Sequence, residues 1–119
     1  EMDSSNVVAH NMMGVLYNER GDFERAQACH RNAIRIAPKD AEGYKWMGKS
    51  YCDQGNYSKA LSFYQKSTMI TQDPETYVLI AEMYGRQNNS NKETSFYKKA
   101  AKQGSKQAKD WLTKRGIAW

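Results

Sequence analysis

A segment of about 34 residues is copied along this sequence, and that repetition limits the possible folds more than any other feature. Five positions of the first copy recur with the same residue 34 positions later: Met13 and Met47, Gly14 and Gly48, Tyr17 and Tyr51, Gly21 and Gly55, and Ala26 and Ala60. A third copy follows at a step of 33, with tyrosines at Tyr77, Tyr84 and Tyr97. A fixed period of about 20 to 50 residues is typical of stacked units, which bury their apolar faces only against neighbours.

Each copy is expected to form two helices, because apolar and small residues recur at helical spacing and strand-like alternation is absent. The two core stripes expected in the first copy are Ala9, Met13, Leu16 and Tyr17, and then Phe23, Ala26, Ala33 and Ile34. Gly21 provides a permissive backbone for the turn between them, and Asn56 and Ser90 are predicted to cap later helices. Small residues at Gly14 and Gly48 predict close approach of the paired helix.

The third copy and the C-terminal end depart from the pattern. Asn88 replaces the turn glycine and Glu93 replaces an alanine, so we expect looser packing in this copy. A last helix is predicted at about residues 105–115, with Ala108, Trp111 and Leu112 covering the final pair. Its lysines would face water, because the terminal units of a solenoid need a polar outer face.

These residues resemble the tetratricopeptide repeat, whose pattern is W-x2-L-G-x2-Y…A-x3-F…P. The first copy reads H-x2-M-G-x2-Y…A-x3-H…P from His10, and the second reads Y-x2-M-G-x2-Y…A-x3-Y from Tyr44. The resemblance covers about residues 7–107 and implies an all-α, right-handed α-solenoid in a single domain of residues 1–119. Three helix pairs would occupy about residues 7–40, 41–74 and 74–107, with a capping helix at about 105–115. The tail is also similar to a Sel1-like repeat.

Composition excludes a membrane-spanning chain. The hydrophobic content is 39%, the mean hydropathy is −0.90, and no apolar run approaches the roughly 20 residues that a spanning helix needs. Cys29 and Cys52 lack the spacing of a metal or disulfide motif, which fits a reducing compartment and favours the cytoplasm. The N-terminus lacks the profile of a secretory signal, although a removed signal stays an alternative.

No motif for catalysis, a cofactor or a metal is present in the sequence. His10 and His30 stand where the repeat pattern has a large aromatic residue, so packing explains both, and no partner stands at metal-ligand spacing. We therefore expect a protein that is not an enzyme and that binds neither cofactor nor metal.

The positive charge is concentrated near the C-terminus. The chain carries a net charge of +5, while residues 92–115 hold eight basic and two acidic residues. Lysines near phosphates release counterions on binding, so an RNA-binding adaptor is one alternative. Solvation of the capping end explains the same lysines, and we do not expect nucleic acid as the main partner.

The resemblance implies a concave groove lined by the first helix of each pair, which binds an extended peptide or a partner's helix. The residues expected to line this groove are Val8, Asn11, Met12, Val15, Lys45, Trp46, Lys49, Cys52, Glu75, Val78, Leu79, Glu82 and Lys109. Trp46 lies one position off the core stripe of its helix, which makes it the expected anchor; the alternative is that it packs sideways between repeats. Lys45 and Lys49 predict a ligand with acidic residues beside its apolar anchors.

The expected function is that of a protein-interaction scaffold, with a fragment of a longer repeat array as the alternative. One subfamily, which clamps the acidic C-terminal tail of heat-shock chaperones, is not expected. The positions that would hold that tail carry Asn11, Val15, Trp46, Glu75 and Leu79, and none matches the clamp. In size and repeat number alone, the chain also resembles three-repeat chaperones of bacterial secretion systems.

Overall fold

The computed structural model describes residues 4–119, and side chains from residue 6 onward. Residues 1–3 of the predicted domain lie outside the described part. Within it the chain forms seven helices and no strand, which confirms the all-α prediction. Their bounds are α1 Ser4–Glu19, α2 Phe23–Ile36, α3 Ala41–Asp53, α4 Tyr57–Ile70, α5 Pro74–Arg86, α6 Ser90–Lys102 and α7 Lys106–Lys114. None of these helices is long and apolar enough to cross a membrane.

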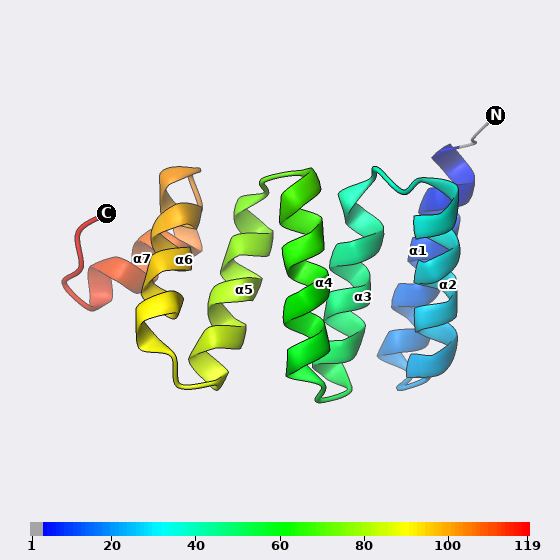
Figure 1. Ribbon diagram of the computed structural model, residues 1–119, viewed down its shortest axis with the longest axis horizontal. Coiled ribbons are helices and arrows are strands. Elements are labelled where there is room, and N and C mark those ends of the chain that lie inside the picture. Colours follow the sequence, from blue (N-terminus) through cyan, green and yellow to red (C-terminus); the bar gives the residue numbers. More distant parts are fainter. Residues whose placement is uncertain (1–3) are drawn as a thin grey trace. The chain divides into compact units, whose positions relative to one another are not determined.

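The contacts divide the chain into two compact units, Glu1–Ile70 and Thr71–Trp119. In the first unit α1 packs on α2, α3 packs on α4, and both α1 and α2 contact α3 (Figure 1). In the second unit α5 packs on α6, and α6 packs on α7. The prediction of one domain over the whole chain stays a prediction.

The helix ends follow the turn chemistry of the repeat. The side chains of Asp22 and Asn56 accept hydrogen bonds from backbone N–H groups three residues on, at the starts of α2 and α4. The predicted cap Ser90 is wrong: Asn89 caps α6 by accepting from the backbone N–H of Lys92, and Ser90 is the first helical residue. The turn residue before it, Asn88, has a φ of 59°, which few residues other than glycine and asparagine adopt.

Close helix approach at the glycines of the repeat is confirmed in the first unit. A Cβ atom added to Gly14 would lie 2.5 Å from the His30 ring, and one added to Gly48 would lie 2.5 Å from the Tyr64 ring. His30 and Tyr64 occupy the same position in successive copies. Each large ring on the second helix of a pair therefore fills the space left by a missing side chain on the first.

The predicted core stripe of α1 is wrong for three of its four residues. Ala9, Met13 and Leu16 are exposed, whereas α1 buries Val7 and Asn11 instead. We call the exposed residues Ala9 and Met13 the outer face of α1; Leu16 lies at the edge of this face and also lines a pocket between α1 and α3. In the next copy the position equivalent to Met13 is Met47, which is 2% exposed, against 48% for Met13. The physical reason is that α3 packs on the preceding pair, while in the described residues no helix lies against the outer face of α1.

The second unit accommodates its departures from the pattern by a compensating change. Glu93 replaces alanine, and Gly85 stands where the preceding copy has Cys52. A Cβ atom at Gly85 would lie 2.3 Å from the Glu93 carboxylate, so the missing side chain makes room for the added one. Burial, together with the charges of Glu82 and Glu93, raises the pKa of Tyr97 to about 12.

Helix α7 covers α6. Its Ala108 and Leu112 are fully buried, and the Trp111 ring stacks on Tyr97 with 4.1 Å between ring centres. Ser105 caps the helix by accepting from the backbone N–H of Ala108. The three residues chosen from the sequence therefore do lie against the last pair.

Candidate functional site

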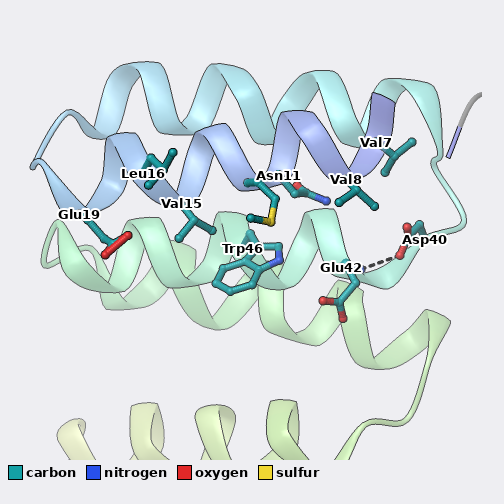
Figure 2. Close-up of a pocket in the computed structure, with 10 residues that line it drawn as sticks. Val7, Val8, Asn11, Val15, Leu16, Glu19, Asp40, Glu42 and Trp46 are labelled. Carbon is teal, nitrogen blue, oxygen red and sulfur yellow. Dashed lines mark hydrogen bonds between the residues drawn. The ribbon is translucent and has the colours of Figure 1, made fainter. Parts of the chain in front are cut away.

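An apolar pocket of about 420 Å³ lies between α1 and α3 in the first unit (Figure 2). We call it the α1–α3 pocket. Its lining residues are Val7, Val8, Asn11, Met12, Val15, Leu16, Glu19, Asp40, Glu42 and Trp46. The volume falls within the range of about 300 to 1,000 Å³ that is usual for ligand-binding pockets.

The repeat itself brings the apolar lining together. Val8, Met12 and Val15 follow one another at steps of four and three residues, which places them on one face of α1. Trp46 stands 34 positions after Met12, so it holds the equivalent place on α3. Because α1 contacts α3, the two equivalent faces meet along one pocket. Met12 is 61% exposed, although it belongs to this lining.

A buried histidine supports the floor of the pocket. His30 on α2 is 1% exposed, and its Nδ1 lies 3.0 Å from Oδ1 of Asn11 on α1. Its ring is nearly parallel to the Trp46 indole, with 6.4 Å between ring centres and 12° between planes. Burial lowers the pKa of His30 from 6.5 to about 4, because a buried imidazolium loses its hydration. The neutral His30 ring on α2 thus contacts Asn11 on α1 and Trp46 on α3, and both of these residues line the pocket.

Acidic side chains stand at the ends of the pocket. Glu19 closes one end, while Asp40 and Glu42 stand at the other (Figure 2). Asp40 caps α3 by accepting from the backbone N–H of Glu42 at 3.0 Å. No basic residue belongs to the lining. A fourth carboxylate, Asp53 on α3, accepts a hydrogen bond from Asn18, the neighbour of Glu19 in the chain.

The two lysines expected to line the groove have other positions. Lys45 is buried outside the lining of the α1–α3 pocket, and its Nζ lies 3.2 Å from a carboxylate oxygen of Glu42. Lys49 is half-buried, with its Nζ 4.7 Å from the centre of the Trp46 ring. Both lysines therefore contact groups of the pocket wall from outside its lining.

The structure brings together five of the residues expected to line the groove: Val8, Asn11, Met12, Val15 and Trp46. In the second unit Val78 is buried in the core and cannot present a surface. Leu79, Glu82 and Lys109 are half-buried there, and a groove shared by all three repeats stays a prediction. The acidic lining residues were missed, although Asp40 and Glu42 stand on either side of the start of the second copy in the sequence.

Trp46 combines the two roles that the sequence left open. It packs sideways on His30 of the preceding pair, and it also lines the α1–α3 pocket. The described residues contain no group of three or more His, Cys, Asp or Glu side chains placed to hold a metal ion. The arrangement can bind an apolar group between acidic ends.

The Trp111 ring at the basic C-terminal end has no free face for stacking. The Trp111 ring stacks on Tyr97, and the Arg115 guanidinium carbon lies 3.9 Å from the Trp111 ring centre. The Tyr97 ring and the Arg115 guanidinium are both too close to the Trp111 ring to lie on the same face of it, so they occupy opposite faces. Binding of single-stranded nucleic acid typically uses free aromatic faces, and the Trp111 ring does not offer one.

Comparison with known proteins gives the family and the fold. Residues 2–82 match the profile of the tetratricopeptide repeat. Over 64 residues the chain is 30% identical to Superkiller protein 3 of Schizosaccharomyces pombe, covering 54% of this chain and 5% of that protein, so it spans a small part of this relative.

Two solved structures illustrate the likeness in fold. The first TPR domain of Spaghetti (RPAP3), bound to the HSP90 peptide SRMEEVD, has a TM-score of 0.81 at 14% identity, covering 95% of this chain and 92% of that one. The translocator chaperone SycD of Yersinia enterocolitica has a TM-score of 0.80 at 15% identity, covering 94% and 87% of the two chains. At such identities the likeness shows the fold alone, an α-solenoid of helix pairs.

Proposed function

Because the chain belongs to the tetratricopeptide repeat family, we propose that it is a non-catalytic interaction scaffold that binds a peptide or helix in the α1–α3 pocket. The observation that carries the proposal is the pocket itself, which places Met12 and Trp46 on facing helices of an apolar cavity. Tetratricopeptide domains are typically interaction modules, and the first TPR domain of Spaghetti holds a peptide in its solved structure.

The pocket has the composition of an interaction hot spot. Aromatic residues and methionine are enriched at the centres of interfaces, where a few anchors contribute most of the binding free energy. Trp46 is held in place by its stack on His30, so little ordering of this side chain is needed when a ligand binds. Met12 is flexible and exposed, and it can adapt to the shape of a bound side chain.

Met12→Gln tests the proposal, because it removes an apolar contact without adding charge. The probe is a peptide selected from a displayed library on the unmodified protein. We expect its affinity to fall by about 30-fold or more, which corresponds to about 2 kcal/mol for the loss of an anchor. Since Met12 is exposed, the melting temperature should change little.

The matched control is Met69→Gln. Met69 lies on α4 and is 86% exposed, so the same substitution there changes the surface without touching the pocket. This control should bind as the unmodified protein does. Equal binding by the Met12 variant would show that the pocket is not the binding site.

A second candidate function, a unit of a longer repeat array, is favoured by the outer face of α1. The equivalent methionine, Met47, is buried on α3, which packs on the second helix of the preceding pair. The occupant proposed for the outer face is therefore the second helix of a further tetratricopeptide pair.

This candidate is tested by comparing two identical substitutions. In this chain Met47→Gln should cost about 2 to 5 kcal/mol of unfolding free energy, and Met13→Gln should cost less than about 0.5 kcal/mol. In the full-length gene product the two costs should become similar. A Met13 substitution that is still neutral in the full-length protein would contradict the array.

A further inference from the structure

We infer that the α1–α3 pocket selects a basic amphipathic helix, whose apolar stripe enters the pocket while lysine or arginine side chains meet the carboxylates at its ends. This inference rests on the proposed function and adds the chemistry of the partner. It reverses the ligand charge expected from the sequence, because the two lysines behind that expectation do not line the pocket.

The charges around the pocket favour a cation at both ends. Glu19, Asp40 and Glu42 belong to the lining, and Asp53 lies beside the same end as Glu19 through its bond to Asn18. Against these four carboxylates stand Lys45, whose ammonium group is paired with Glu42, and Lys49 on the Trp46 ring. The negative charge belongs to the lining itself, which holds three carboxylates and no basic residue, while Arg20 and Lys39, the chain neighbours of Glu19 and Asp40, lie outside it.

The length of the pocket suits a helix of three to four turns. Val8 and Glu19 are eleven positions apart on α1, which corresponds to about 16 Å at a rise of 1.5 Å per residue. Asp40 and Glu42 stand at the opposite end from Glu19 (Figure 2). A ligand helix with basic residues about eleven positions apart can therefore reach both acidic ends while its apolar stripe covers Met12 and Trp46.

The overall charge of the protein makes this preference a sharp test. The chain as a whole is positive, at +5, so unspecific attraction would favour an acidic peptide over a basic one. A preference for the basic peptide therefore requires local negative charge. Because the carboxylates at the pocket ends are partly exposed, the preference should weaken as salt screens them.

The experiment uses two fluorescein-labelled peptides of about 15 residues, which is long enough to span the pocket as a helix. Both carry leucines at helical spacing (i, i+3, i+4, i+7), and their flanking positions are lysine in one and glutamate in the other. Anisotropy titrations should show the lysine peptide binding at least about tenfold more tightly at low salt. A third peptide, the lysine version with a central proline, should bind poorly because proline breaks the helix.

Three variants locate the effect. Glu19→Lys should reduce the preference for the lysine peptide several-fold, since it reverses a charge at one end of the pocket. Its matched control is Glu24→Lys, an exposed residue on α2 outside the lining, which should leave the preference unchanged. Met12→Gln should weaken both peptides alike, because it removes an apolar contact and no charge.

The outcomes separate the inference from the proposed function. Tighter binding of the glutamate peptide, lost in Met12→Gln, would overturn the inference and leave the proposed function standing. Equal loss of preference in Glu24→Lys and Glu19→Lys would overturn the inference as well. If neither peptide binds, or if Met12→Gln has no effect on either, the inference and the proposed function both fail.

Discussion

Acid should destabilise the first unit through His30. The folded state holds this imidazole neutral, with its pKa lowered from 6.5 to about 4, because the ring is buried between Asn11 and Trp46. Between about pH 4 and pH 6.5, His30 binds a proton in the unfolded chain but not in the folded chain. The stabilising contribution is therefore complete above pH 6.5, declines as the pH falls, and is fully lost below about pH 4.

The size of this effect follows from the pKa difference. One pKa unit corresponds to about 1.4 kcal/mol, so the difference between 6.5 and about 4 amounts to about 3 kcal/mol. His30 is almost completely buried, so solvent screening reduces this value little. A loss of that size is a large fraction of the roughly 5 to 15 kcal/mol by which domains are stable.

The assay is urea denaturation followed by circular dichroism at pH 7.5 and at pH 4. His30→Tyr is the informative variant, because Tyr64 fills the equivalent position of the next copy against an equivalent glycine. This variant should lose about 3 kcal/mol less than the unmodified protein between the two pH values. His10→Gln serves as the control and should keep the full acid sensitivity. If His30→Tyr and the unmodified protein lose the same free energy, the buried neutral histidine is not the cause.

Three further substitutions test the packing of the helix pairs by thermal or chemical denaturation. Gly48→Ala should destabilise by about 1 to 3 kcal/mol despite its better helix propensity, because the new Cβ would lie 2.5 Å from Tyr64; a stabilised variant would contradict the close approach. Trp111→Ala should cost about 3 kcal/mol through loss of its stack on Tyr97, and an unchanged midpoint would mean that α7 is not docked. Trp46→Ala should both weaken ligand binding and lower stability, because the indole also packs on His30; loss of binding alone would argue against that stack.

The helix pairs and the apolar half of the pocket could be predicted from the sequence. The 34-residue period identifies equivalent positions, so Met12 and Trp46 could be assigned to one surface before their contacts were known. Periodicity describes one face of a helix, however, and does not say whether a neighbour covers it. That is why Met13 was expected in the core and is exposed.

The charges of the site could not be predicted in the same way. A position in the repeat predicts the direction in which a side chain leaves the helix, but it does not predict where the charged end of a long side chain lies. The four-carbon stem of Lys45 lets its ammonium group reach Glu42. The cap of α6 was misplaced by one residue because Asn89 and Ser90 are both good capping residues. The sequence of the third copy also contains both halves of a change in side-chain volume: Gly85 is smaller than Cys52 at the equivalent position, and Glu93 is larger than Ala60.

The contact between Gly85 and Glu93 links the two departures of the third copy energetically. A Cβ at residue 85 would lie 2.3 Å from the Glu93 carboxylate, the flexible end of that side chain, so any side chain at residue 85 requires this carboxylate to move. Restoring the cysteine and the alanine of the second copy at these two positions should therefore be non-additive, because alanine at residue 93 removes the group that a side chain at residue 85 would displace.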